Sequence, residues 1–183
     1  MRIQGGEFKG KKLSFRPKKG LRPTTSKVKG AIFNILKAKI PGSYFLDLFA
    51  GTGSVGLEAL SRGAIFSAFV EKSAREASII RRNLEESQLN GLVLSMDVLK
   101  GIDYLKKAGK AFDIVFLDPP YEKGLVNSTL SLLSDGGCLV KGAIILAERS
   151  RREGISLPPS FELIREYRYG DTILSLLKWK GEE

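Results

Sequence analysis

The chain has 183 residues, 43% of them hydrophobic, which is enough for one globular domain with a full core. No apolar run approaches the roughly 20 residues that span a bilayer, and the first residues lack an apolar signal segment, so we expect a cytoplasmic protein without membrane contact. The absence of His excludes a Ser-His-Asp triad and disfavours a zinc site, and the single Cys138 cannot form an internal disulfide. We therefore expect no metal.

The positive charge is concentrated at the start of the chain. Residues 1–39 contain 12 Lys or Arg and one acid, Glu7, whereas residues 40–183 contain 18 Lys or Arg and 19 acids. The net charge of +10 therefore originates in the first fifth of the chain. Apolar residues such as Ile3 and Leu13 interleave with these charges, which favours a folded segment over a solubilising tail. An ordered cationic patch indicates a polyanionic partner such as nucleic acid.

The first residues, "RIQGGEFKGKKLSF", predict two short strands that turn at Gly5-Gly6 or at Lys9-Gly10. We assign residues 1–20 to a basic β-hairpin extension and residues 21–183 to the main domain. The side chains of the extension that we expect to contact nucleic acid are Arg2, Lys9, Lys11, Lys12, Arg16, Lys18 and Lys19. A helix capped by Thr25 or Ser26 follows, and Pro41-Gly42 ends it.

From residue 44 onward, strand and helix patterns alternate. The predicted elements are strand 44–49, helix 54–62, strand 66–71, helix 74–87, strand 92–96, helix 98–108, strand 112–118, helix 125–133 and strand 142–148. Continuous apolar strands between helices indicate a parallel sheet covered on both faces. Residues 161–180 instead predict two strands turning at Gly170-Asp171, which would place an antiparallel strand in the sheet. The expected fold is one doubly wound, mostly parallel, seven-stranded α/β domain.

The stretch "DLFAGTGSVGLEAL" carries a G-x-G-x-x-G pattern directly after the first predicted strand. Such a loop holds either a dinucleotide or another adenosine cofactor, and Glu71, 20 residues beyond Gly51, has the spacing of an acid that binds ribose hydroxyls. Asp47 would repel a pyrophosphate, whereas it would attract the ammonium and sulfonium groups of S-adenosylmethionine. We therefore predict S-adenosylmethionine rather than NAD, with Gly51 and Gly53 allowing close backbone approach.

A second motif, Asp118-Pro119-Pro120-Tyr121, follows the apolar strand 112–118. Pro119 forces Asp118 into an extended conformation, and neither proline has an N–H to donate. The carboxylate and the carbonyl oxygens are thus presented as acceptors beside an aromatic ring. Acceptors next to a stacking surface suit a planar base with an exocyclic amine. The same residues could also simply form a rigid turn.

Together these motifs resemble the class I S-adenosylmethionine-dependent amino-methyltransferases. The set "RIQGGEFKGKKL", "LRPTT", "DLFAGTGSVGLEALSRGA", "VEK", "DPPY" and "YGDTILSLL" resembles one branch closely, the RsmD-like bacterial methyltransferases of guanine N2 in small-subunit (16S) ribosomal RNA. The resemblance implies that Asp118, Pro119 and Tyr121 are catalytic. It implies a cofactor site made of Asp47, Gly51, Gly53, Glu71, Asp97 and Val98, with Arg22 and Thr24 closing the pocket. The implied partner is ribosomal RNA or the small ribosomal subunit.

Two other functions are compatible with parts of this pattern. DNA adenine-N6 methyltransferases also carry D-P-P-Y, but reading a duplex usually takes a target-recognition domain. Only 66 residues separate Gly51 from Asp118, and 62 follow Tyr121, so the predicted sheet leaves no room for one. A non-catalytic RNA-binding module is the second alternative, and the intact acids and D-P-P-Y argue against it.

Overall fold

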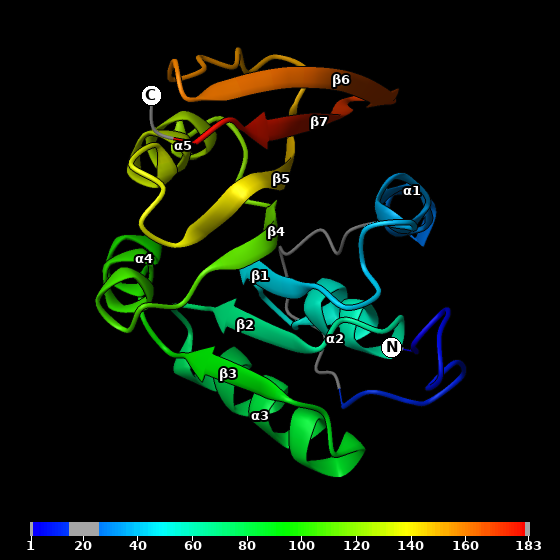
Figure 1. Cartoon of the computed structure of the whole chain (residues 1–183). Coiled ribbons are helices and arrows are strands. Elements are labelled where there is room, and N and C mark those ends of the chain that lie inside the picture. The colour runs from blue at the N-terminus through cyan, green and yellow to red at the C-terminus, as the bar shows by residue number, and fades with distance from the viewer. Residues whose placement is uncertain (1, 15–25, 182–183) are drawn as a thin grey trace.

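The computed structural model describes residues 2–14 and 26–181 (Figure 1). A seven-stranded sheet in the order β3-β2-β1-β4-β5-β7-β6 runs through the molecule. Neighbours among β1 to β5 are parallel, and β7 is antiparallel to both β5 and β6. The strands are β1 (Tyr44–Leu48), β2 (Phe66–Val70), β3 (Gly91–Leu94), β4 (Phe112–Leu117), β5 (Leu139–Ser150), β6 (Phe161–Tyr169) and β7 (Thr172–Trp179). The predicted sheet class and its antiparallel strand are confirmed.

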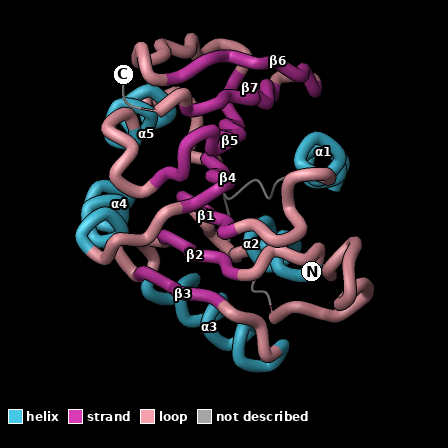
Figure 2. Tube along the Cα trace, viewed as in Figure 1, coloured by secondary structure: helices cyan, strands magenta, loops and turns pink. Residues whose placement is uncertain are grey.

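Helices cover both faces of the sheet (Figure 2). They are α1 (Ser26–Leu36), α2 (Ser54–Ser61), α3 (Ala74–Ser87), α4 (Val98–Lys107) and α5 (Leu125–Leu133). Successive strand residues point to opposite faces, so Phe45 packs in the cluster with α1, α2 and α3 while Leu46 packs in the cluster with α4 and α5. Each parallel strand therefore supplies two cores, which explains its continuous apolar sequence.

Strand β5 is longer than the sequence predicts. It covers Leu139–Ser150, whereas the apolar pattern covers 142–148. At its carboxyl end, Glu148 and the two residues after it pair with Thr172 to Leu174 of β7. Because the antiparallel partner supplies hydrogen bonds to this polar end, the strand continues beyond Ala147, the last residue paired with β4.

The expected N-terminal β-hairpin is not confirmed. Within residues 2–14, the only bridge is an isolated antiparallel one between Arg2 and Lys12, and the chain between them forms turns. Two backbone hydrogen bonds join the limbs, from the Ile3 N–H to the Lys11 carbonyl (3.1 Å) and from the Gly10 N–H to the Ile3 carbonyl (2.9 Å), but donors between them bind helix α2 instead of a partner strand. The N–H of Glu7 donates to the Ser61 carbonyl (2.8 Å), and that of Phe8 donates to the Ser61 Oγ (3.0 Å). The remaining residues of the predicted extension lie outside the described ranges.

The segment 2–14 is nevertheless part of the folded core. Ile3 and Leu13 are buried in the same cluster as α1, α2 and α3. Gly6 approaches α2 so closely that a Cβ would lie 1.7 Å from the Ser61 carbonyl oxygen, and its φ of 80° also favours glycine. The basic side chains of residues 2–14 are therefore carried by a segment packed on the domain, not by a free tail.

The buried carboxylate of Glu58 joins this segment to two helices. Glu58 is fully buried on α2 and lies 3.0 Å from the Lys29 Nζ of α1 and 2.9 Å from the Arg62 Nη2. One of its oxygens also accepts the backbone N–H of Gln4 at 2.8 Å. Because Lys29 is itself 4% exposed, removing the carboxylate charge would leave a buried ammonium without its counter-charge.

We expect Glu58→Gln to lower the free energy of unfolding by about 3 kcal/mol, the usual cost of breaking a buried ion pair from one side. Glu86→Gln is the matched control, because Glu86 pairs with Arg82 on the exposed surface of α3 and should change stability little. Urea denaturation of both variants at pH 7 measures the difference. Equal midpoints for the two variants would contradict this account of Glu58.

Candidate active site

Three glycines shape the loop after β1 and the start of α2. Gly51 and Gly53 have φ values of 53° and 71°, in the left-handed region, and Gly53 precedes the first residue of α2. A Cβ on Gly53 would lie 2.9 Å from Ile80 of α3. A Cβ on Gly56 would lie 2.3 Å from the Phe69 ring of β2, so this third glycine lets α2 pack closely on the sheet. The pattern thus fixes a narrow turn at the carboxyl edge.

Asp47 lies beneath this loop and is 2% exposed. Its Oδ2 accepts the backbone N–H of Gly56 at 2.9 Å. Burial raises the pKa of the Asp47 carboxyl to about 7, and the negative charges of Asp118 and Glu71 add to that increase. The Gly56 N–H and the positive charge of Lys29 act in the opposite direction. Three acids from the ends of three adjacent strands therefore lie within electrostatic reach of one another.

Glu71 directly follows β2 and holds the opposite side of the loop. Its Oε2 accepts the N–H of Gly51 at 2.8 Å, and its Oε1 accepts the N–H of Ser73 at 2.7 Å. A carboxylate offers about four lone-pair positions, so two remain for a ligand after these bonds. Glu71 is 8% exposed, which leaves a small part of the group open to solvent.

Asp97 lies beyond the end of β3 and caps helix α4. Its Oδ1 accepts the N–H of Lys100 at 3.0 Å, and its side chain is exposed. Val98, the first residue of α4, is half-buried and packs against the second core cluster. The β3 edge joins the site through the backbone, because the N–H of Glu71 donates to the Leu94 carbonyl at 3.0 Å. The adenine contact of Asp97 and Val98 stays a prediction.

Asp118 follows β4, the central neighbour of β1. Leu117 pairs with Leu48 of β1 on one side and with Ala147 of β5 on the other, which places Asp118 at the middle of the carboxyl edge. Asp118 is half-buried, whereas Pro119 is buried. The structure therefore brings the D-P-P-Y motif and the glycine loop together, as the sequence predicts.

The ring of Tyr121 is held at its hydroxyl end. The hydroxyl donates to the Glu148 Oε1 at 2.9 Å and lies 3.0 Å from the Thr172 Oγ1. Burial raises the pKa of the Tyr121 phenol above its usual range, and the hydrogen bond with Thr172 opposes that increase. Glu148 lies on β5 and Thr172 on β7. The ring is therefore positioned by two strands that come later in the chain than the D-P-P-Y motif.

Sequence reasoning missed both of these partners. Glu148 ends the predicted strand 142–148, so the rule that singled out Asp47 and Glu71 as acids at strand ends also applies to it. Thr172 lies in the stretch "YGDT", whose connection with Tyr121 spans 51 residues and has no local sign in the sequence. The predicted pocket residues Arg22 and Thr24, and the predicted RNA contacts Arg16, Lys18 and Lys19, lie outside the described residues.

Comparisons with known proteins bear on this arrangement. The family model described as "Conserved hypothetical protein 95" matches residues 1–178. The chain belongs to this family. It is 36% identical to the Ribosomal RNA small subunit methyltransferase D of Escherichia coli (strain K12), covering 100% of this chain and 91% of that protein.

Solved structures of other proteins share the fold of this chain. A structure from Escherichia coli, described as that of a methyltransferase, superposes with a TM-score of 0.87 at 34% identity and covers 100% of this chain and 99% of that one. A methyltransferase complexed with SAH has a TM-score of 0.66 at 17% identity, over 87% of this chain and 50% of that one, and shares the fold.

In the present protein, the acids at the carboxyl edge of the sheet favour a ligand with positive charge. Asp47 accepts the N–H of Gly56 in the first turn of α2, and Glu71 accepts that of Gly51 in the glycine loop, so both occupy groups to which a phosphate would otherwise bind. A pyrophosphate there would face two carboxylates, whereas a cationic ligand would relieve their mutual repulsion. The donor set therefore fits S-adenosylmethionine, which carries no phosphate. In residues 2–14 and 26–181, no group of three or more Cys, Asp or Glu could hold a metal ion, and no helix could span a membrane.

The raised pKa of Asp47 predicts a particular pH dependence of stability. Between about pH 4 and pH 7 the folded state retains a proton that the unfolded state has lost, so this group lowers stability as the pH rises through that range. Asp47→Asn removes the effect and can still accept the Gly56 N–H. We expect the variant, without ligand, to gain roughly 2 kcal/mol over the parent protein between pH 5 and pH 8. Urea denaturation at both pH values tests this, and a pH-independent difference would contradict it.

Proposed function

We propose that the protein transfers a methyl group from S-adenosylmethionine to the exocyclic N2 of a guanine in small-subunit ribosomal RNA. The observation that carries the proposal is the position of Asp118-Pro119-Pro120-Tyr121 at the carboxyl end of β4, beside the buried acids Asp47 and Glu71. The full-length similarity to a ribosomal RNA small subunit methyltransferase supports the same substrate class.

The cofactor would be held by groups on three strand ends. We propose that Asp47, Gly51 and Gly53 hold the methionine part and that the free lone pairs of Glu71 accept the ribose hydroxyls. Asp97 and the Val98 backbone would border the adenine. S-adenosylmethionine supplies an electrophilic methyl group bonded to a positively charged sulfur. Arg22 and Thr24 complete the proposed pocket.

The acceptors of the D-P-P-Y motif would activate the target amine. The N2 lone pair of guanine is delocalised into the ring, so the amine is a poor nucleophile. The Asp118 carboxylate and the Pro119 carbonyl would each accept a hydrogen bond from one of its two N–H groups and direct the lone pair toward the methyl group. The methylated nitrogen becomes cationic and then releases a proton, so no strong base is needed beforehand. This order suits a chain without His. The Tyr121 ring, held by Glu148 and Thr172, would stack on the extruded base.

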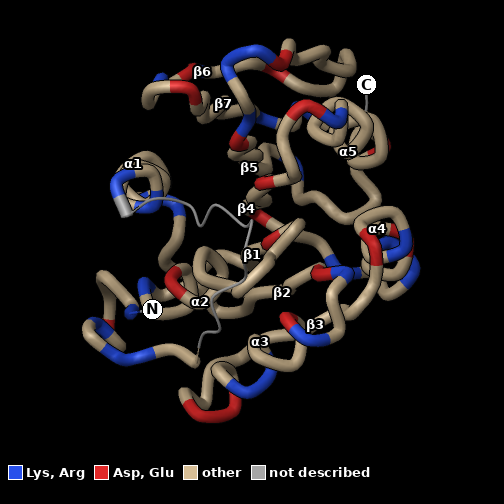
Figure 3. The backbone as a smooth tube through the Cα atoms, turned by 180° about the vertical axis from the view of Figure 1, so that it is seen from behind, with Lys and Arg blue, Asp and Glu red and all other residues tan. Residues whose placement is uncertain are grey.

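The surface of the N-terminal segment supports an RNA partner. Arg2, Lys9 and Lys12 are exposed on the loop that packs against α2, and the loop carries Lys and Arg along its length (Figure 3). Lys11 is more restricted, because its Nζ donates to the Glu86 carbonyl of α3 at 2.8 Å. Exposed lysines on an ordered backbone can bind phosphates without reading sequence.

The proposed chemistry predicts a separation of transfer from cofactor binding. Asp118→Ala should lower the single-turnover rate of methyl transfer to 16S ribosomal RNA by roughly 100-fold or more, as for the loss of one preorganised polar group. Its affinity for S-adenosylmethionine should change little. Asp103→Ala, which removes an exposed acid on α4, is the control. Rapid-quench measurement with labelled cofactor decides, and a near-normal rate in Asp118→Ala would remove Asp118 from the chemistry.

Replacing Lys9 and Lys12 together by Gln should weaken RNA binding and reduce the slope of log affinity against log salt by about 0.7–0.9 for each phosphate that is no longer neutralised. Substitution is preferable to deletion, because Ile3 and Leu13 of the same segment are buried. The exposed Lys107→Gln on α4 is the matched control. Titrations at three salt concentrations measure the slope, and a slope equal to that of the control would show that the segment does not bind phosphates.

A further inference from the structure

A cavity of about 610 Å³ lies beside the D-P-P-Y motif and is not used by the proposed chemistry. It opens between the loop after β4 and the loop after β5. Its lining includes Glu122, Gly124, Asn127, Arg152, Glu153 and Ser156. Glu122 follows Tyr121 directly in the chain, so the cavity begins one residue beyond the D-P-P-Y motif.

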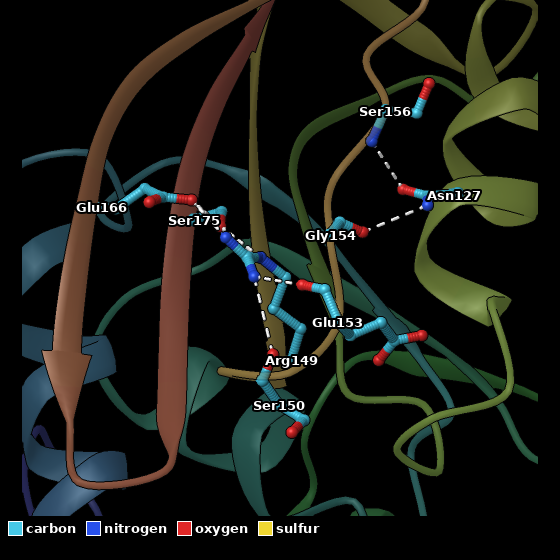
Figure 4. A network of polar contacts seen from close by, with 8 residues as sticks. All are labelled: Asn127, Arg149, Ser150, Glu153, Gly154, Ser156, Glu166 and Ser175. Carbon is cyan, nitrogen blue, oxygen red and sulfur yellow. Dashed lines mark hydrogen bonds and ion pairs between the residues drawn. The ribbon is translucent and has the colours of Figure 1, made fainter.

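The walls of this cavity are joined by one side chain of the loop after β5, Glu153, and one of helix α5, Asn127. The Glu153 carboxylate accepts the N–H of Glu122 at 3.3 Å and that of Gly124 at 3.0 Å. The Asn127 side chain donates to the Gly154 carbonyl at 3.2 Å and accepts the N–H of Ser156 at 2.9 Å (Figure 4). The loop after β5 is therefore fixed relative to the start of α5.

A buried arginine braces the same loop from behind. Arg149 is 5% exposed and forms an ion pair with Glu166 of β6. It also donates to the Ser175 Oγ of β7 at 3.1 Å and to the Glu153 carbonyl (Figure 4). These bonds hold the exposed turn in one arrangement, so a ligand would not need to order it first.

The cavity offers a guanidinium for a phosphate and acceptors for a base, and its two carboxylates, Glu122 and Glu153, restrict a phosphate to the side of Arg152. Arg152 is exposed at the lining, and within the described parts of the chain it forms no ion pair. Its guanidinium can bind a phosphate in a bidentate manner. The carboxylate of Glu153 and the hydroxyl of Ser156 lie in the same lining and can accept hydrogen bonds from a base that carries amino groups.

We propose that this cavity binds the nucleotide next to the target guanine, with its phosphate on Arg152 and its base against the wall formed by Glu153 and Ser156. The inference rests on the proposed function. Extruding one base leaves its neighbours partly unstacked, and among base-extruding enzymes the deaminases contact the flanking nucleotides to choose their substrate. The cavity would in this way contribute to the choice of RNA sequence around the target.

The test compares Arg152→Gln with Arg151→Gln, its exposed neighbour that does not line the cavity. With a 16S ribosomal RNA substrate, Arg152→Gln should raise the KM for RNA roughly three- to tenfold and reduce the salt slope by about 0.7–0.9, the value of one phosphate contact. Cofactor affinity and melting temperature should match those of the parent protein. If the two variants behave alike, the cavity does not bind a phosphate.

A second variant tests the base position. Ser156→Tyr would occupy part of the cavity at the proposed base position, while its backbone N–H still donates to Asn127. We expect a raised KM for RNA, and the variant should no longer respond to an abasic site at one nucleotide flanking the target. An unchanged KM would overturn the base contact. The parent protein in the same assay separates the two proposals. If it transfers no methyl group, the proposed function is wrong. If it transfers normally and the two substitutions leave the KM for RNA unchanged, only the proposed nucleotide site in the cavity is wrong.

Discussion

The arrangement of the site depends on two carboxylates that bind backbone N–H groups of the glycine loop and of the first turn of α2. Asp47 takes the N–H of Gly56 and Glu71 takes that of Gly51, so the loop is held from below and from the side. The loop can pass between them because Gly51 and Gly53 adopt left-handed conformations. Holding Asp47 in the interior is unfavourable, as its raised pKa indicates. A cationic ligand at the proposed cofactor site would offset that cost.

Helix α2 connects this loop with the basic segment. Its first residues carry the glycine turn, and its last residues, together with Glu58, bind the backbone of residues 2–14. Because the helix is only eight residues long, the proposed cofactor site and the proposed RNA surface are attached to opposite ends of one rigid element. The ion pair between Glu58 and Lys29 extends the connection to α1.

The far side of the site is built by strands β5, β6 and β7. Tyr121 reaches Glu148 and Thr172, while Arg149 ties the loop after β5 to Glu166. The terminal antiparallel strand therefore does more than close the sheet, because it carries a partner of the aromatic ring beside the proposed target base. The contact between Tyr121 and Thr172 thus connects the stretches "DPPY" and "YGDT".

The sequence by itself determined the elements whose signals are local. Helices 74–87 and 125–133 match the structure at both ends, since their apolar spacing lies within the segments and the residues that bound them are their direct neighbours in the chain. The acids Asp47, Glu71 and Asp118 could be placed at one edge because parallel strands end together. Only the tertiary structure decided the docking of residues 2–14, where Gln4 binds Glu58 across 54 positions, and the partners of Tyr121. These contacts join residues far apart in the chain through hydrogen bonds between single groups, and such pairs leave no periodic pattern in the sequence.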